Sequence, residues 1–446
     1  MPRKANAPLP QPVFDEPTFN EAATQPAPTG FAVPHPSDTQ QYDAIKKLLA
    51  TETVSFATMR GKPDDLYTLQ DALGPHGAER IAAITKAGQI IFHSAGDTGA
   101  SNAGKYQHEI KVADQVTEDC QSADPAACPA FFYHLGDTVY DFGESQFYYD
   151  QFYEPFRNYP CPIVAIPGNH DSFVVPNTPD ADTPLSIFTR NFCATNPVIT
   201  AEARSLHRTA MTQPGVYFTL DAPFVRIIGL FSNALEDPGL ISSEKGHWKG
   251  VPDVQLDYLK AQLQLIKSQK YAGAVILAVH HPPFTYSAPP SKGSAAGNHG
   301  SSSDMLREID TICTAAGVYP HAFLSGHAHN YQRYTRTVTF GGSKYTVPFV
   351  VCGDGGHNVT LMVQSRKGVP AKRPVRNAKV DYLEKNPAVK TEGLTLAGFD
   401  DANYGYLRIT VNAKKLMIGF YPVGAAESVK PDVVTVDLAS HTIVAK

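Results

Sequence analysis

The sequence predicts a four-layer αββα sandwich, an α+β or α/β architecture in which two mixed β-sheets lie face to face between outer helices. Two observations lead to this prediction. Five short apolar runs, each with β-branched or aromatic residues, are typical of buried strands, and helical patterns between them imply crossover connections. Two further pairs of runs are typical of hairpins, so parallel and antiparallel strands should share the sheets.

The expected elements follow one another along the chain. Buried strands are expected at 89–94, 131–135, 162–166, 274–279 and 321–324. Helices are expected at 42–49, 144–156, 254–268 and 304–315. The pattern is plainest in 254–268, where apolar residues recur at helical spacing: Leu256, Leu259, Leu263 and Ile266. Hairpins are expected at 216–220 with 225–230 and at 406–411 with 415–421.

A polar motif follows each of the five buried strands. The motifs are Asp97-Thr98-Gly99, Gly136-Asp137-Thr138-Val139-Tyr140, Gly168-Asn169-His170-Asp171, His280-His281 and Gly326-His327-Ala328-His329. Loops just beyond strand ends are where sites form in layered α/β folds. The glycines allow sharp turns and close backbone approach. The metal site is therefore expected at one edge of the sandwich.

The residue types in these motifs suit a pair of hard-to-borderline cations. The candidate metal ligands are Asp97, Asp137, Tyr140, Asn169, His280, His327 and His329. No cysteine is among them, which argues against a structural zinc site. Two cations a few Å apart can clamp a phosphate, activate water and stabilise a leaving oxygen. The motifs therefore predict dimetal-dependent hydrolysis of a phosphoester.

The motif set resembles the calcineurin-like metallophosphoesterase superfamily and, more narrowly, the purple acid phosphatases. Two features point to that branch: Gly99 stands where most relatives have a metal-binding histidine, and Tyr140 follows three residues after Asp137. A phenol ionises with a pKa near 10, so a bound phenolate favours a strongly Lewis-acidic ion. The resemblance, which covers about residue 87 to the C-terminus, therefore implies Fe(III) at one site.

The resemblance implies one ligand set for each metal ion. The Fe(III) site would comprise Asp97, Asp137, Tyr140 and His329, and the second site, holding Fe(II), Zn or Mn, would comprise Asp137, Asn169, His280 and His327. Asp137 would bridge the two ions. The implied activity is hydrolysis of phosphate monoesters by a metal-bound hydroxide, as in an acid phosphatase.

The resemblance also implies residues that face the substrate. His170 would contact the phosphate or protonate the leaving group, a role worth roughly 10²–10⁴ in rate. His299 is expected to assist it, and Asn169 would adjoin the substrate. The expected partners are a small phosphorylated substrate and inorganic phosphate.

Two other functions stay open. A phosphodiesterase of the same superfamily is favoured by His281, which directly follows His280, and is opposed by Tyr140. A non-catalytic phosphate-binding protein would also keep the fold. Other histidines on apolar strands, His93, His134 and His321, are expected to be hydrogen-bonded core residues.

Composition sets the domain plan and limits the partners. We expect a Pro/Ala-rich N-terminal arm at 1–40, a lead-in segment packing on the catalytic domain at 41–86, and the catalytic domain at 87–446. The net charge of −5 and the pI near 6.3 argue against a nucleic-acid partner. The sequence contains no run of about 18 apolar residues, so no membrane span is expected.

Location and redox state stay open. The basic start of the chain is not followed by an apolar stretch, so no secretory signal is expected. A full-length chain would then be cytoplasmic, and a trimmed one periplasmic or secreted. Cys120 and Cys128 flank a polar loop and would close a small disulfide or remain thiols, two alternatives of equal weight.

Overall fold

A computed structural model describes most of the chain. It describes Lys47, Ala50, Thr51 and Val389 together with residues 59–122, 127–172, 185–286, 299–362, 364–366, 369–379, 392–424 and 429–445. The expected arm at 1–40 and most of the helix expected at 42–49 lie outside the described residues. The structure therefore does not test either of those predictions.

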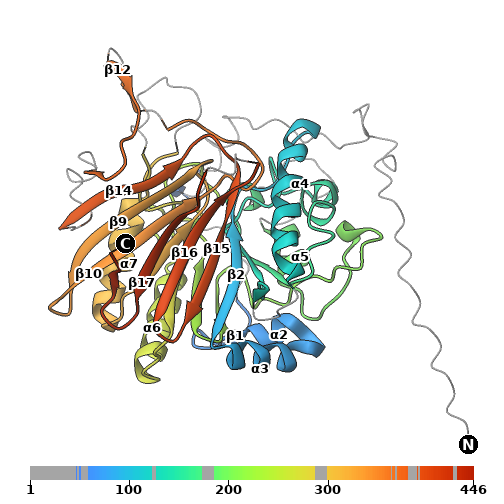
Figure 1. Cartoon of the computed structure of the whole chain (residues 1–446), viewed down its shortest axis with the longest axis horizontal. Coiled ribbons are helices and arrows are strands. Elements are labelled where there is room, and N and C mark those ends of the chain that lie inside the picture. Colours follow the sequence, from blue (N-terminus) through green and yellow to red (C-terminus); the bar gives the residue numbers. More distant parts are fainter. Residues whose placement is uncertain are drawn as a thin grey trace, which may run out of the picture.

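Two mixed β-sheets form the centre of the molecule (Figure 1). In spatial order, the nine-stranded sheet comprises β1 (Tyr67–Thr68), β5 (Phe218–Ala222), β6 (Val225–Leu230), β7 (Ala274–Val279), β8 (Ala322–Ser325), β10 (Ser343–Cys352), β9 (Tyr331–Phe340), β14 (Gly393–Asp400) and β13 (Ala378–Lys379). The seven-stranded sheet comprises β18 (Thr442–Ile443), β17 (Asp432–Asp437), β16 (Lys415–Pro422), β15 (Gly405–Asn412), β2 (Gln89–Ala95), β3 (Phe132–His134) and β4 (Ile163–Ala165). A separate hairpin pairs β11 (Gln364–Arg366) with β12 (Val369–Lys372).

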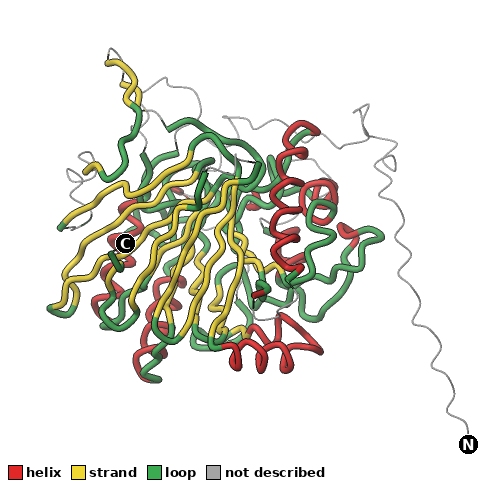
Figure 2. The backbone as a smooth tube through the Cα atoms, viewed as in Figure 1, coloured by secondary structure: helices red, strands yellow, loops and turns green. Residues whose placement is uncertain are grey.

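Helices lie outside the sheets (Figure 2). They are α2 (Leu69–Leu73), α3 (Gly77–Ala87), α4 (Ala103–Glu118), α5 (Ser186–Phe192), α6 (Val254–Ser268) and α7 (Ser303–Ala316). Alternate residues of β7 serve opposite layers: Ile276 packs in the core between the sheets, whereas Val275 and Leu277 pack with residues of α6 and α7. The predicted αββα sandwich is confirmed.

The outer face of the seven-stranded sheet is tied to α4. Asp119, which follows α4, lies 3.1 Å from His93 Nε2 on β2 and accepts a hydrogen bond of 2.9 Å from the Tyr406 hydroxyl on β15. Farther out on this sheet, Met417 of β16 is 38% exposed. The helical layer therefore covers the β2 side of the sheet and leaves part of the C-terminal hairpins to solvent.

Most expected elements occur where they were predicted, and two departures have physical causes. The segment 144–156 forms a 3₁₀ turn (Ser145–Phe147) and a π-helical turn (Tyr149–Tyr153) instead of one helix. All five residues of the π turn are buried, and the Gln151 amide bonds both the N–H and the C=O of Tyr140 (2.8 and 2.7 Å). Helix α4 was not expected, because its buried face includes the charged Glu109.

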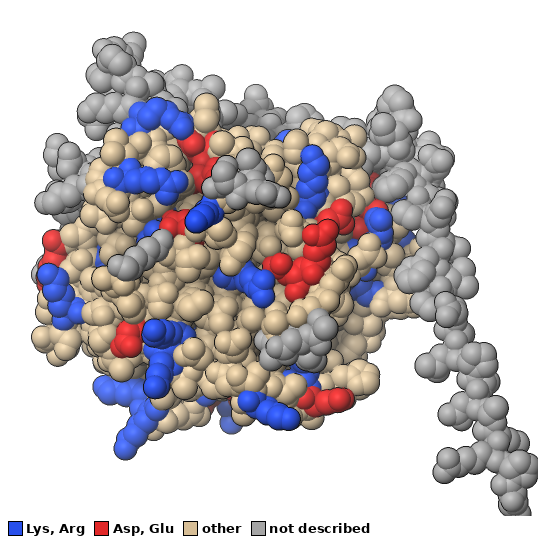
Figure 3. Space-filling view, in the orientation of Figure 1, with Lys and Arg blue, Asp and Glu red and all other residues tan. Residues whose placement is uncertain are grey.

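Cys120 and Cys128 are free thiols. The Cys128 thiol donates to the carbonyl oxygen of Cys120 (3.3 Å), which a disulfide between these two residues would not allow. In the part of the chain that the structure describes, no helix combines the length and apolarity needed to cross a bilayer. On the face shown in Figure 3, basic and acidic side chains are interspersed.

The topology brings the polar motifs together. β2, β3 and β4 run parallel as neighbours in one sheet, and β7 and β8 do so in the other. Parallel neighbours end at the same edge of their sheet. The loops that follow these five strands therefore meet where the carboxyl edges of the two sheets adjoin.

Candidate metal centre

The loops at this edge turn through strained backbone. Asp97, Asp137 and His327 have φ values of 56°, 55° and 67°, in the left-handed region that non-glycine residues rarely adopt. Such conformations cost of order 1–3 kcal/mol each and cluster at functional sites. At Gly136 (φ 100°), an added Cβ would lie 2.5 Å from the Gly168 nitrogen and 2.7 Å from His280 Nδ1. Only glycine allows these loops to approach so closely.

One half of the centre gathers around the Tyr140 hydroxyl. This oxygen donates toward Asp97 Oδ1 and Asp137 Oδ2, both at 3.0 Å, and lies 3.3 Å from His329 Nε2. His329 Nε2 is in turn 3.4 Å from Asp97 Oδ1. The Tyr140 side chain is buried. Four ligand-type groups from three separate loops therefore converge on one point.

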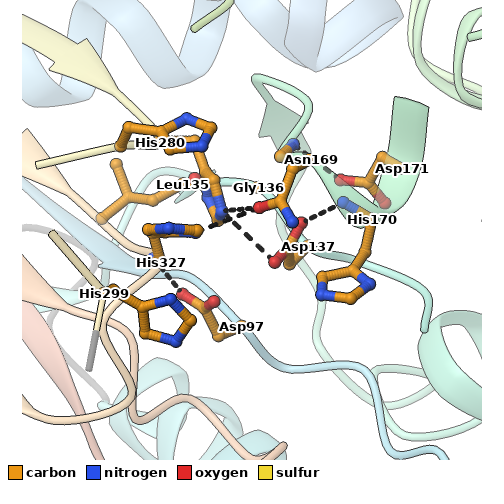
Figure 4. A network of polar contacts seen from close by, with 12 residues as sticks. Asp97, Leu135, Gly136, Asp137, Asn169, His170, Asp171, His280, His299 and His327 are labelled. Atoms are coloured by element: carbon orange, nitrogen blue, oxygen red, sulfur yellow. Dashed lines mark hydrogen bonds and ion pairs between the residues drawn. The ribbon is translucent and has the colours of Figure 1, made fainter. Parts of the chain in front are cut away.

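The other half gathers around the Asn169 side-chain oxygen (Figure 4). Asn169 Oδ1 lies 3.0 Å from His280 Nε2 and 3.0 Å from His327 Nδ1. His280 Nε2 is 3.2 Å from Asp137 Oδ2, the same oxygen that faces Tyr140. Ligand atoms of Asp137, His280 and His327 all lie within 4.8 Å of one another. Asp137 is thus shared by the two halves.

Partners outside the ligand set fix its orientation. The His280 Nδ1–H donates to the Leu135 carbonyl oxygen (2.8 Å), which leaves Nε2 free as a ligand atom. The His327 backbone N–H donates to Asp97 Oδ2 (2.7 Å). Asp171 accepts backbone N–H bonds from Thr138 and Gly168, both at 2.9 Å. These bonds join the loops of both sheets into one rigid frame.

The donor set fits two cations. The imidazole nitrogen His327 Nε2 is buried and has no hydrogen-bond partner among the described residues. The pKa of His327 lies well below its usual range, mainly through burial and then through the neighbouring His299, so the ring is held neutral, as a metal ligand must be. Burial also lowers the pKa of His280, but the Asp137 carboxylate more than offsets this and raises it to about 9. Buried negative charge of this kind is compensated by bound cations.

The two expected substrate-facing histidines lie beside the ligands. The His170 backbone N–H donates to Asp137 Oδ1 (2.9 Å), and its Nδ1–H donates to the Asp141 carbonyl oxygen (2.6 Å). The His299 ring centroid lies 4.2 Å from that of His327 and 5.1 Å from that of His329. The structure therefore brings all nine residues proposed from the sequence to one centre.

Histidines outside the ligand set have other partners. His93 bonds Tyr159 and Asp119, and His134 bonds Thr98 Oγ1 and the Gly136 N–H, which confirms both as core residues. His281 uses both ring nitrogens, one with Ser232 Oγ and one with the Leu235 carbonyl oxygen, each at 2.7 Å. His281 therefore anchors the loop that follows β6 and offers no nitrogen to a substrate.

Sequence reasoning missed three groups at the centre. Glu236 Oε2 accepts a bond of 3.3 Å from Asn169 Nδ2, and Asp237 Oδ1 lies 3.8 Å from His327 Nε2. The His357 imidazole stacks on the Tyr140 ring, with centroids 3.5 Å apart. The first two lie in an irregular loop with no motif. For His357 the only signal was its place directly after Gly353-Asp354-Gly355-Gly356.

A shallow hollow of about 10 Å³, with room for about one water molecule, opens beside the centre. His299 and His329 lie on its wall, together with Tyr286 and the apolar side chains of Leu361 and Met362. Leu361 is 59% exposed, so this side of the hollow is open to solvent. A molecule held here would lie against residues of the centre.

Comparisons with known proteins agree with this geometry. The family model for calcineurin-like phosphoesterases matches residues 95–331, just over half of the chain and all of the five motifs. No curated protein matches. Two solved structures are similar. GAP50, described as the anchor in the inner membrane complex of Plasmodium, is 12% identical with a TM-score of 0.48, over 77% of this chain and 88% of that one. PhoD is 14% identical with a TM-score of 0.42, over 79% of this chain and 70% of that one.

At these identities the two structures say nothing about activity. The family match spans the strand-end motifs, which include the buried Asp137, His280 and His327 group. This chain belongs to the calcineurin-like phosphoesterase family.

Proposed function

We propose that the protein hydrolyses phosphate monoesters with two metal ions. Asp97, Tyr140 and His329 would hold the first ion, and Asn169, His280 and His327 the second, with Asp137 bridging them. The observation that carries this proposal is the position of the Tyr140 hydroxyl, 3.0 Å from both Asp97 and Asp137. A phenol aimed at two carboxylates is a ligand arrangement suited to a trivalent ion.

The first ion is proposed to be Fe(III), and the second Fe(II), Zn or Mn. Phenolate and carboxylate oxygens suit a hard trivalent cation, whereas the amide and imidazole set at the second site suits a divalent one. When bound, the two ions neutralise the charge of the phosphate and activate a water molecule.

His170 is the proposed proton donor to the leaving group. Its Nδ1–H donates to the Asp141 carbonyl oxygen, which fixes the orientation of the ring beside Asp137. Burial lowers the pKa of His170, but the carboxylates of Asp137 and Glu236 more than offset this, and the net shift is upward. A protonated His170 is thereby favoured at acidic to neutral pH, which suits a general acid.

His299 is proposed to contact the phosphate, and the rim of the neighbouring hollow to face the leaving group. The pKa of His299 is held well below its usual range by burial and by His329, so the ring stays neutral and can accept a hydrogen bond. Tyr286, Leu361 and Met362 form an apolar side to the hollow. An apolar leaving group would contact this rim from the solvent side.

Hydrolysis of phosphodiesters is the second candidate. His281 no longer supports it, because both its ring nitrogens are bonded within the fold. Glu236 does support it: its carboxylate is 44% exposed and lies 3.5 Å from His299 Nδ1. A negative charge at that point repels the dianion of a monoester more strongly than the monoanion of a diester.

One assay separates the two activities. An aryl phosphate monoester and the matching diester are compared from acidic to alkaline pH, with Tyr140→Phe assayed in parallel. We expect preference for the monoester, an acidic optimum, and a visible colour that Tyr140→Phe removes while the fold is retained. Preference for the diester near neutral pH would reject the monoesterase, and protein that binds no metal would leave only the non-catalytic phosphate-binding role.

A further inference from the structure

His357 contacts both the tyrosine and the aspartate of the first proposed metal site. Its imidazole stacks on the Tyr140 ring, with centroids 3.5 Å apart and an interplanar angle of 18°. Its backbone N–H donates to the carbonyl oxygen of Asp97 (2.9 Å). Its side chain is only 6% exposed. His357 is nevertheless no ligand candidate, because neither of its ring nitrogens is available.

The partners of those nitrogens fix the proton on the ring. His357 Nδ1 lies 2.6 Å from the carbonyl oxygen of Gly99, which only accepts, so Nδ1 carries the hydrogen. His357 Nε2 lies 2.6 Å from the Lys105 ammonium, which only donates, so Nε2 accepts. The ring is therefore neutral and cannot flip without losing both bonds. The hydrogen bonds at Nδ1 and Nε2 together fix the plane of the ring against which Tyr140 packs.

Lys105 anchors this arrangement to helix α4. It lies in the first turn of α4, where its backbone N–H is capped by the Asn102 side chain (3.0 Å). The chain before His357 is pressed against the same helix: an added Cβ at Gly356 would lie 2.7 Å from the Cα of Glu109. The line from α4 through Lys105 and His357 to Tyr140 thus consists of direct contacts.

We propose that His357 and Lys105 are positioning residues for Tyr140. His357 holds the phenol ring in the plane that keeps its oxygen between Asp97 and Asp137, and Lys105 fixes His357 and places a cation one ring away from the phenol. The inference rests on the proposed function, in which Tyr140 binds the first metal ion. In that function, His357 and Lys105 would orient Tyr140, the ligand that distinguishes the first metal site.

The proposal gives different expectations for the two metal sites. Removing an outer partner of a metal ligand lowers metal affinity by roughly 10–100-fold. We therefore expect His357→Leu to weaken binding at the first site by roughly 10–100-fold and to leave the second site unchanged. Lys105→Met removes a positive charge near the phenolate, so the phenolate gives up an electron more easily and its charge-transfer band moves to longer wavelength.

The experiment uses the full chain loaded with iron. Metal content per chain is measured during titration with a chelator, and the visible spectrum is recorded at each step, for wild type, His357→Leu, Lys105→Met and Tyr140→Phe. His357→Gln keeps a donor and an acceptor in place of the ring and is expected to restore part of the first-site affinity. Lys111→Met, an exposed lysine on the same helix, is the matched control and should behave as wild type.

The outcomes separate this inference from the proposed function. A coloured wild type with His357→Leu and Lys105→Met unchanged in both affinity and spectrum would overturn the positioning role alone. A colourless wild type would overturn the Fe(III) assignment, and first-site affinity would then decide the positioning role. Equal loss of both metal ions, with a lower thermal midpoint, would show that His357 serves only the fold and would also reject the inference.

Discussion

Two clusters of histidines lie at opposite ends of strand β8. At its amino end, His321 and His441 stack with ring centroids 4.1 Å apart, and Tyr345 stacks on His441 at the same distance. At its carboxyl end, His327 and His280 approach to 5.1 Å across the candidate metal centre. The residue type is the same in the two clusters, but the partners of the ring nitrogens differ.

At the amino end the ring nitrogens bond backbone groups. His321 accepts from the Val275 N–H (3.0 Å), and His441 donates to the Pro320 carbonyl oxygen (2.8 Å). At the carboxyl end the nitrogens face an amide oxygen, carboxylates and one another, and His327 Nε2 has no hydrogen-bond partner in the described chain. A buried polar group without a hydrogen-bond partner costs about 1–3 kcal/mol. The first cluster is bonded within the fold, whereas the second brings ligand-type nitrogens and carboxylates together at one point.

The largest test of this difference is Asp137→Asn. The substitution keeps the shape of the side chain but removes the charge shared by both halves of the centre. Because the cations supply several kcal/mol of charge stabilisation, we expect kcat/KM to fall by roughly 10³-fold or more. The rate on an aryl monoester and the metal content would be measured together, with far-UV circular dichroism as the control for folding. Turnover near that of wild type would reject the assignment of the centre.

One substitution made at each end of β8 sharpens the comparison. His321→Leu leaves the Val275 N–H without its acceptor, so we expect it to lower the free energy of unfolding by about 1–3 kcal/mol and to leave activity unchanged. His327→Leu should have the reverse effect, with activity reduced at least about 100-fold and the stability of chelated protein unchanged or raised. Urea unfolding and rate assays on both variants measure this. Matching effects of the two substitutions would remove the distinction between the clusters.

The sequence predicted the site better than its surroundings. Apolar runs, turn glycines and metal-ligand residue types are local signals, so the five strands and the motifs after them could be placed before the structure was known. The contact of His357 with Lys105 joins residues 252 positions apart and depends on how β10 delivers the chain to α4. Nor could hydrophobic periodicity reveal α4, whose buried face includes Glu109, or the π turn, where every residue is buried. Features that depend on tertiary packing cannot be predicted from the local pattern of one sequence.

The last expected effect is a dependence of stability on pH from the amino-end cluster. Burial and mutual repulsion lower the pKa of His321 to about 3, and burial lowers that of His441 to about 4. Both groups are neutral in both states above about pH 7.5, where they contribute no pH dependence. Below pH 6.5 these histidines bind protons in the unfolded chain but not in the folded chain. The free energy of unfolding therefore decreases as the pH is lowered, until the folded pKa values are reached.

At pH 5 this loss is about 2 kcal/mol for each histidine. The free energy of unfolding in urea would be compared at pH 7 and pH 5 for wild type and for the double variant His321→Gln with His441→Gln. Other buried histidines, such as His134, are present in both proteins, so the difference in slope isolates the pair. We expect the free energy of unfolding to change less with pH in the double variant than in wild type. The control His76→Ala, which removes an exposed histidine, should show the same pH dependence as wild type. Parallel curves for wild type and the double variant would mean that the folded protein does not hold His321 and His441 neutral, and that bonded ring nitrogens do not separate a structural cluster from a functional one.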